Sequence, residues 1–154
     1  MCGIAGGEKV EELVRHLQHR GQSSCTDGDF GHILHSVIGH VEQPVHGEGT
    51  LIANCEIYNW QELADEYDLE VENDAELLLE LLDMKGTKAL EELDGVYAFA
   101  YRTDKEIIIA RDLLGIKPVW YSEKPFSFAS EKQAFEKEGL EAIELHPRHV
   151  LRYD

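Results

Sequence analysis

The sequence predicts a layered α+β domain, with helices packed outside stacked and mainly antiparallel sheets. Two near-continuous apolar runs, residues 96–100 and 107–110, are typical of strands covered on both faces. The polar stretch 102–105 joins these runs as a hairpin connection would. Helical patterns with one apolar face lie elsewhere in the chain. Because such helices bury that face against a neighbour, they supply the outer layers of the predicted domain.

The first half of the chain alternates between helical and extended patterns. Ile4 and Ala5 begin a buried strand, and apolar residues at helical spacing predict a helix over residues 8–19. The polar, turn-rich residues 19–28 predict a loop, and alternation predicts a strand over 30–41. A strand at 50–54, a loop at 54–59 and a helix at 60–67 complete this half.

The second half begins with a helix whose start and end are both marked. Asn73 and Glu76 form a capping-box pattern at its start, and Gly86 suits its end. A second capping-box pattern at 130–133 predicts a helix that Gly139 closes. The remaining elements are a short helix at 87–92 and short strands at 119–121, 126–129 and 150–153.

Length and charge limit the kinds of function. The 154 residues predict one domain, residues 1–154, large enough for a core. The net charge of −17, from 31 acidic and 14 basic residues, makes nucleic acid a poor partner. No apolar run approaches membrane-spanning length, and the N-terminus lacks a signal-peptide pattern. We therefore expect neither a nucleic-acid nor a membrane partner.

The cysteines and histidines indicate a reducing compartment. Cys2, Cys25 and Cys55 form neither a metal-type spacing nor an even-numbered disulfide set. The four histidines between residues 32 and 46 are too irregularly spaced for a recognised metal site. Neither common glycine-rich nucleotide loop occurs. These observations predict a cytoplasmic location, no metal and no cofactor.

Cys2 is the candidate nucleophile because it directly follows the initiator methionine. Removal of Met1 gives Cys2 a free α-amine, whose pKa of about 7.7–8.0 lets it act as a base for its own thiol near neutral pH. One residue then supplies both nucleophile and base. Taken alone, a cysteine at this position is more often a small buried residue, so the interpretation depends on the motifs that follow.

Seven motifs, in order along essentially the whole chain, resemble those of the class II, N-terminal-nucleophile glutamine amidotransferases. The likeness is closest to the N-terminal glutaminase domain of glutamine-hydrolysing asparagine synthetase. The motifs are Met1-Cys2-Gly3-Ile4-Ala5-Gly6, His19-Arg20-Gly21, Asn54-Cys55-Glu56-Ile57-Tyr58-Asn59, Asn73-Asp74-Ala75-Glu76, Leu93-Asp94-Gly95-Val96-Tyr97-Ala98-Phe99-Ala100, Ala110-Arg111-Asp112-Leu113-Leu114-Gly115-Ile116-Lys117-Pro118 and Phe128-Ala129-Ser130-Glu131.

The resemblance implies a four-layer αββα sandwich and hydrolysis of glutamine to glutamate and ammonia through a thioester on Cys2. It implies that Asn54 and the backbone N–H of Cys55 stabilise the developing oxyanion. It further implies that Asp74 accepts the α-ammonium of glutamine and that Glu56 lines the pocket. An ATP-dependent synthetase domain or subunit would receive the ammonia. Whether the chain is a fragment or a stand-alone subunit is left open.

Three positions depart from the family pattern. Cys55 stands where the family usually has glycine, and its side chain either approaches Cys2 or forms a buried, inert thiol. Gln22-Ser23 replaces the usual Pro-Asp after His-Arg-Gly. Alignment places Val37 where an arginine normally clamps the α-carboxylate of glutamine. We therefore expect weak glutamine binding.

Three functions compete on this sequence. The leading one is an active glutaminase that delivers ammonia to a synthetase partner. The second is a weak or inactive domain that serves as an interaction and regulatory module, and Val37 is its main support. The third is an N-terminal cysteine hydrolase that acts on another amide.

Overall fold

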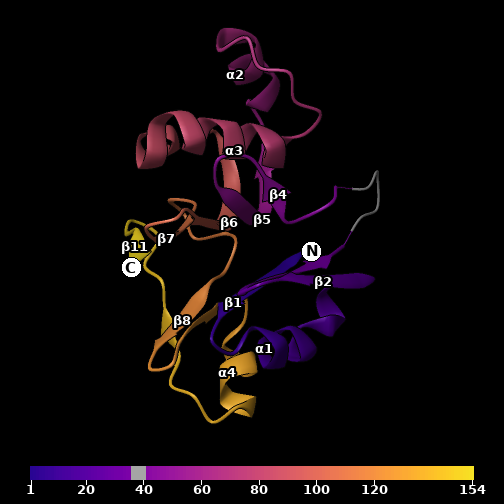
Figure 1. The fold of residues 1–154 in the computed structure, drawn as a ribbon, viewed down its shortest axis with the longest axis vertical. Coiled ribbons are helices and arrows are strands. Elements are labelled where there is room, and N and C mark those ends of the chain that lie inside the picture. Colours follow the sequence, from indigo (N-terminus) through magenta and orange to yellow (C-terminus); the bar gives the residue numbers. More distant parts are fainter. Residues whose placement is uncertain (36–40) are drawn as a thin grey trace.

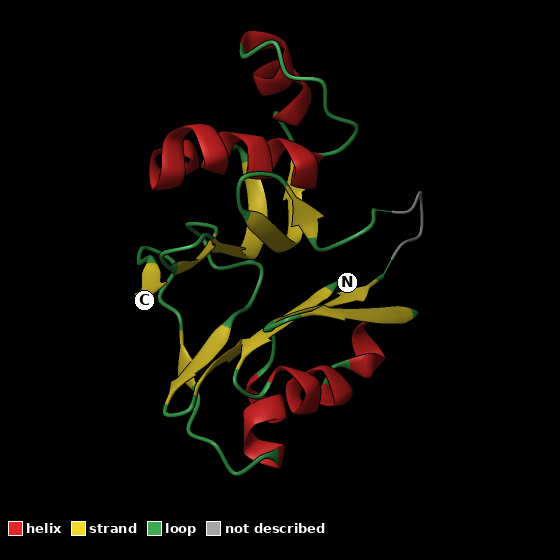
Figure 2. Cartoon of the chain, viewed as in Figure 1, coloured by secondary structure: helices red, strands yellow, loops and turns green. Residues whose placement is uncertain are grey.

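Two antiparallel sheets stack face to face in the computed structural model, which describes residues 1–35 and 41–154 (Figures 1 and 2). The first sheet contains, in spatial order, β10 (Ile143–Glu144), β8 (Trp120–Glu123), β9 (Phe126–Ala129), β1 (Gly3–Gly7), β3 (Phe30–Leu34) and β2 (Ser23–Asp27). The second contains β11 (Leu151–Tyr153), β7 (Ile107–Arg111), β6 (Gly95–Arg102), β5 (Thr50–Ile57) and β4 (Val45–His46).

Helices cover the outer face of each sheet (Figure 1). The first sheet carries α1 (Val10–His16) and α4 (Lys132–Lys137), and the second carries α2 (Trp60–Glu66) and α3 (Asp74–Lys85). Short 3₁₀ helices follow α1 and α3, at Gln18–Arg20 and Gly86–Glu91. The predicted four-layer αββα sandwich is therefore confirmed. No helix in the described part of the chain is long and apolar enough to span a membrane.

Alternation along the strands creates three apolar layers. In β1, Ile4 packs into the layer between the sheets, whereas Ala5 packs outward against α1 and α4. In β5, Ile52 faces the layer between the sheets and Ala53 faces α3. Successive side chains in a strand point to opposite faces, so the alternation at Ile52 and Ala53 also gives the direction of the next two side chains of β5. Asn54 therefore points into the central layer, and Cys55 points toward the α3 side.

Strand registers bring the N-terminus to the centre of the sandwich. β1 pairs with β3 so that Gly3 lies opposite Ile33, and with β9 so that Ala5 lies opposite Ala129. Cys2 therefore directly precedes a strand that is paired on both sides. Figure 1 places this N-terminus between the two sheets.

Two elements differ from their predictions, and a third is described only in part. Residues 23–27 of the predicted loop form β2, an edge strand whose mostly exposed side chains carry no apolar alternation. Residues 54–57 belong to β5 rather than to a loop, because they continue the β5–β6 pairing as far as Gly95. The predicted strand at 30–41 is confirmed as β3 up to Leu34, and residues 36–40 lie outside the described residues.

The predicted capping box at 130–133 is also wrong. The helix begins at Lys132, and Glu131 at its N-cap makes no side-chain cap hydrogen bond. Ser130 instead accepts a hydrogen bond from the backbone N–H of Ile4 at 2.9 Å, far away in the sequence. The Asn73 cap is confirmed, since its Oδ1 accepts the N–H of Glu76 at 2.9 Å.

Candidate functional site

Cys2 lies half-buried at the head of β1, with its thiol held by the backbone of His35. The His35 N–H donates to the Cys2 Sγ, and the thiol donates to the His35 carbonyl oxygen. The donor–acceptor distance is 3.4 Å in each case. These contacts fix the sulfur beside the end of β3. Both contacts are with backbone groups, so neither supplies a side-chain base for the thiol.

Arg20 connects the backbone of Cys2 to Glu131, which lies 111 residues after Arg20 in the sequence. Its Nε donates to the Cys2 carbonyl oxygen at 3.0 Å, and its Nη1 donates to Glu131 at 2.8 Å. Partial burial alone would raise the pKa of Glu131, but hydrogen bonds from Gln133, His19 and Arg20 lower it to about 2. The carboxylate therefore stays charged, and it anchors the guanidinium that holds the nucleophile's backbone.

Asn54 presents an unpaired donor to the layer between the sheets. The residue is only 3% exposed, and its Nδ2 has no hydrogen-bond partner among the described residues. A buried donor without a partner costs about 1–3 kcal/mol, and such groups in folded proteins call for an explanation. Cys2 directly precedes β1, which contacts β5 across this layer, and Figure 1 places the N-terminus between the two sheets. The arrangement provides a donor for an oxygen that is bound near the thiol.

The open edge of β5 carries a row of backbone N–H groups. The Ala53 N–H donates to the side chain of Gln43 at 2.6 Å, and the Ile57 N–H donates to Asp74 Oδ2 at 2.9 Å. Alternate N–H groups of a strand point to the same side. The N–H of Cys55 therefore points toward the same edge, between these two occupied positions.

Cys55 lies on the α3 side of β5, within electrostatic reach of Asp74 at the first turn of α3. Burial raises the pKa of the Cys55 thiol well above its usual value, and the charge and hydrogen bond of Asp74 raise it further. Cys2 adds a smaller increase, and Lys117 partly opposes these effects. Cys55 is thus a neutral thiol within electrostatic reach of Cys2, Asp74 and Lys117. All three cysteines of the chain are free.

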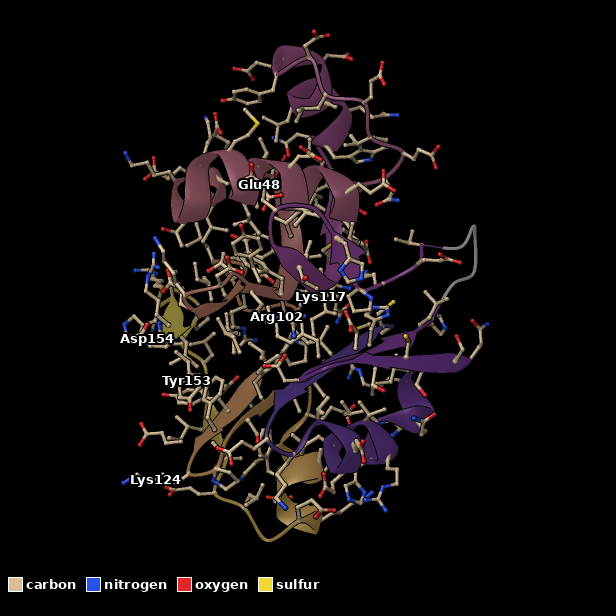
Figure 3. All side chains as sticks on the ribbon, viewed as in Figure 1. Glu48, Arg102, Lys117, Lys124, Tyr153 and Asp154 are labelled. Atoms are coloured by element: carbon tan, nitrogen blue, oxygen red, sulfur yellow. The ribbon has the colours of Figure 1, made fainter. Side chains whose placement is uncertain are left out.

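Glu56 has an exposed side chain, which is held by a buried lysine. Lys117 Nζ donates to Glu56 Oε1 at 3.2 Å, and the lysine side chain is 8% exposed against 64% for the glutamate. Figure 3 labels Lys117 in the region between the two sheets. Sequence reasoning missed this contact of Lys117 with a predicted pocket residue, because the two residues lie 61 positions apart in the chain.

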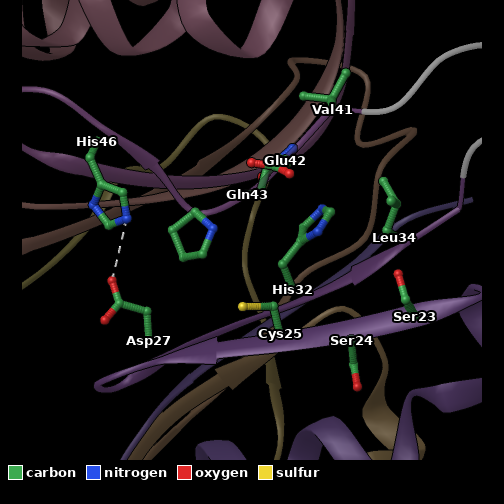
Figure 4. Close-up of a pocket in the computed structure, with 11 residues that line it drawn as sticks. Ser23, Ser24, Cys25, Asp27, His32, Leu34, Val41, Glu42, Gln43 and His46 are labelled. Carbon is green, nitrogen blue, oxygen red and sulfur yellow. Dashed lines mark ion pairs between the residues drawn. The ribbon is translucent and has the colours of Figure 1, made fainter.

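A cavity of about 430 Å³ lies between β2, β3 and residues 41–46 (Figure 4). His32 points into it from β3, and the His46–Asp27 ion pair of 3.6 Å lies at its edge. Burial lowers the pKa of His32 to about 4, although a hydrogen bond to the backbone of Ala53 favours the charged form. In the described part of the chain, no three histidine, cysteine or acidic side chains are placed to hold a metal ion.

The family model for the glutamine amidotransferase domain matches residues 1–153. The chain belongs to this family. Asparagine synthetase B of Escherichia coli is 34% identical over 129 residues, covering 73% of this chain and 23% of that protein. Asparagine synthetase 2 of Arabidopsis thaliana is 28% identical over 181 residues, covering 97% of this chain and 31% of that protein.

Solved structures support the fold of this amidotransferase domain. The glutamine phosphoribosylpyrophosphate amidotransferase of B. subtilis superposes with a TM-score of 0.76 and 23% identity, covering 98% of this chain and 46% of that one. At that identity the likeness concerns the fold alone. The domain spans between 18% and 39% of the length of the curated relatives it matches.

The structure brings most of the predicted site residues of the amidotransferase domain together. Cys2 precedes β1, which contacts β5, the strand that carries Asn54 and Cys55, and Asp74 accepts the Ile57 N–H of the same strand at 2.9 Å. The charges of Cys2 and Asp74 both act on the Cys55 thiol. Val37, the predicted replacement for the carboxylate-binding arginine, lies outside the described residues. The clamp formed by Arg20 and Glu131 was missed, because its two motifs lie 111 residues apart and only the fold joins them.

Proposed function

We propose that this domain hydrolyses the side-chain amide of glutamine to glutamate and ammonia, with Cys2 as nucleophile. The single observation that carries the proposal is the unpaired Nδ2 of Asn54 in the layer that Cys2 faces. A buried, preoriented donor of this kind stabilises an oxyanion, and its removal typically costs about 2.7–4 kcal/mol in other hydrolases. Membership of the family supplies the substrate class.

The chemistry begins with removal of Met1, which is exposed and leaves Cys2 with a free α-amine. This amine takes the thiol proton as the sulfur attacks the amide carbon of glutamine. The Asn54 Nδ2 and the Cys55 N–H stabilise the oxyanion of the tetrahedral intermediate. The protonated amine then donates its proton to the departing nitrogen, which leaves as ammonia. Water hydrolyses the resulting thioester, releases glutamate and restores the thiol.

Asp74 binds the α-ammonium of the substrate in this proposal. Its carboxylate lies at the first turn of α3, close to Cys55 and next to the row of N–H groups on β5. Glu56 lines the same region while it is held by Lys117. The ammonia passes to an ATP-dependent synthetase domain or subunit, because the relatives that the chain matches are named glutamine-hydrolysing asparagine synthetases and are much longer.

The test is a glutaminase assay on the chain, together with intact-mass measurement of its N-terminus. We expect glutamate and ammonia in equal amounts from a preparation that begins at Cys2. Cys2→Ala should abolish both products, and its circular dichroism should match that of the parent chain. Fully retained Met1 in an active preparation would falsify the proposed role of the α-amine as base.

A second candidate function, an interaction module with little or no hydrolysis, is favoured by the hydrogen bond that Asp74 Oδ2 already accepts from the Ile57 N–H at 2.9 Å. That contact occupies the carboxylate proposed for the substrate ammonium. The same assay separates the two functions, because a silent module releases no ammonia from glutamine even when its N-terminus is Cys2.

A further inference from the structure

Arg20 binds the Cys2 carbonyl oxygen beyond the point where β1 and β9 pair. That pairing begins only at Ala5. Nearer the chain start Ser130 takes over, and its N–H donates to the Ile4 carbonyl oxygen at 2.9 Å. Alternate carbonyl groups along an extended chain point to the same side, so the Cys2 carbonyl oxygen points that way as well. There it accepts the Arg20 Nε–H at 3.0 Å.

The side chain of Arg20 fits in this place because Gly3 has no side chain. A Cβ added to Gly3 would lie 3.1 Å from Arg20 Cδ and 3.4 Å from its Nε. Both separations are shorter than the roughly 3.5–4.0 Å at which carbon atoms pack best. Arg20 is therefore packed directly against the start of β1, and only 8% of it is exposed.

Glu131 supplies the charge that keeps this guanidinium in place. It accepts the Arg20 Nη1 at 2.8 Å, and its own carboxylate is held by hydrogen bonds to His19 at 2.7 Å and Gln133 at 2.5 Å. The Arg20 Nη2 has no hydrogen-bond partner among the described residues. A buried charge without a partner is costly, so a guanidinium that lost Glu131 would turn toward water. The Cys2 carbonyl oxygen would then be released.

We infer that Glu131 is a positioning residue for the proposed hydrolysis, because through Arg20 it fixes the backbone of Cys2 and so aligns the nucleophile with the Asn54 donor. The inference deepens the proposed function and rests on it. β1 contacts β5, the strand that carries Asn54, so the donor stays in place when Cys2 is released. A displacement of about 1 Å between reacting groups can lower a rate about a hundredfold.

The first experiment measures steady-state kinetics with glutamine on full chains whose intact mass shows that they begin at Cys2. Glu131→Ala should lower kcat by about tenfold to a hundredfold and leave KM within about threefold, because the carboxylate acts through Arg20. Glu131→Gln keeps an oxygen that accepts from Arg20, so its kcat should lie between those of Glu131→Ala and the parent.

Glu138→Ala is the matched control. The Glu138 carboxylate has an ion pair with His16 at 2.6 Å and is 26% exposed, against 21% for Glu131. It lies at the end of α4, whereas Glu131 lies at the start of the same helix. Its loss removes a similar pair without touching Arg20, so kcat should stay within about twofold of the parent.

A double-mutant cycle separates alignment from a general loosening of the fold. In a chain that carries Asn54→Ala, the donor with which Cys2 must be aligned is missing. Adding Glu131→Ala to that chain should therefore lower kcat by less than about threefold further. A general loss of structure would instead lower kcat by the same factor with and without Asn54.

The second experiment does not depend on hydrolysis. Amide hydrogen exchange is followed by mass spectrometry in the peptide that covers residues 2–7, under conditions in which urea denaturation shows every chain to be folded. Glu131→Ala should speed exchange in this peptide, because the start of β1 is no longer tied to Arg20. Glu138→Ala should leave exchange there at the rate of the parent.

Any one of four results would overturn the inference. They are a kcat for Glu131→Ala within about threefold of that for Glu138→Ala, a KM that changes as much as kcat, equal factors in the two Asn54 backgrounds, and unchanged exchange in residues 2–7. The proposed function fails separately, if chains that begin at Cys2 release no ammonia from glutamine. In that case the exchange measurement alone decides whether Glu131 holds Cys2 in place.

Discussion

Asn54 and His32 are both buried polar residues with an unpaired side-chain nitrogen, and they have different consequences. Asn54 is uncharged at any ordinary pH, and in our proposal its unpaired Nδ2 donor is available to a bound oxyanion. His32 titrates, and its burial makes the protonated form costly. Asn54 therefore bears on the proposed catalysis, and His32 bears on the pH dependence of stability.

Replacing Asn54 tests the oxyanion role. We expect Asn54→Ala to lower kcat by about a hundredfold to a thousandfold, with a much smaller change in KM, because its donor acts mainly in the transition state. Asn54→Asp should be at least as damaging, since a carboxylate repels the oxyanion. Steady-state kinetics with glutamine measure both effects. A kcat within threefold of the parent for Asn54→Ala would contradict the assignment.

His32 predicts a loss of stability in mild acid. Its pKa falls from 6.5 to about 4 on folding, so the unfolded chain takes up the proton first as the pH drops. Stability is therefore full above pH 6.5 and declines until about pH 4. This linkage corresponds to about 2 kcal/mol between pH 7 and pH 5. Urea denaturation at both pH values measures it.

The control for this prediction is a histidine on the surface. His32→Gln should remove most of the difference between pH 7 and pH 5, whereas His149→Gln, at an exposed position, should retain it. Equal pH dependence in the His32→Gln chain and the parent would show that another group is responsible.

Among the elements, the loop that follows β7 is built around one buried carboxylate. Asp112, 2% exposed, accepts backbone N–H groups from Tyr97 at 3.1 Å, Ile116 at 2.8 Å and Lys117 at 3.0 Å. Arg111 braces the same loop by donating to the carbonyl oxygens of Gly115 and Lys117, among others. The loop fixes the position of Lys117 and thereby the lysine that holds Glu56.

Asp112→Ala removes the acceptor for all three N–H groups. We expect the free energy of unfolding to fall by about 3 kcal/mol or more, because hydrogen bonds to a charged group are worth about 1.5–3 kcal/mol each and water will compensate in part. Asp104→Ala, at an exposed turn, should change it by less than about 0.5 kcal/mol. Urea denaturation compares the two variants, and similar losses would contradict the special role of Asp112.

For the whole molecule, the layer between the sheets makes the two halves one cooperative unit. Phe128 is fully buried there and meets Phe30 edge to face, with ring centroids 5.7 Å apart. Arg102 adds a polar link between the sheets, through an ion pair with Asp29 and a cation–π contact with Phe30 at 4.7 Å. The site depends on this layer, since Cys2 and Asn54 come from opposite sheets.

Phe128→Ala should therefore lower the free energy of unfolding by about 3–5 kcal/mol, as expected when a fully buried aromatic side chain is truncated. Far-ultraviolet and near-ultraviolet circular dichroism should report the same urea midpoint, because the sheets unfold together. Leu114→Ala, at a position that is 83% exposed, serves as the control and should leave the midpoint nearly unchanged. Two separate midpoints in the parent chain would show that the sheets unfold independently.

Sequence reasoning predicted the layered fold and most elements because those depend on local patterns. Doubly apolar runs identified β6 and β7, and Asn73 with Gly86 marked the two ends of α3. It failed at β2, whose exposed side chains carry no periodic signal, and at Ser130, whose hydroxyl bonds to β1 rather than capping a helix. In both cases the deciding partner lies in another strand.

The sequence by itself identified the groups that we propose for the chemistry: a thiol beside the chain start, an amide in the Asn54 motif and a carboxylate at a helix start. Tertiary structure decided what surrounds them. It holds the Cys2 sulfur on the backbone of His35, ties Arg20 to Glu131, and brings Asp74 to the Ile57 N–H of β5. The physical reason is that side-chain type is encoded locally. Burial, pairing and electrostatic reach instead arise only when strands distant in the sequence are stacked.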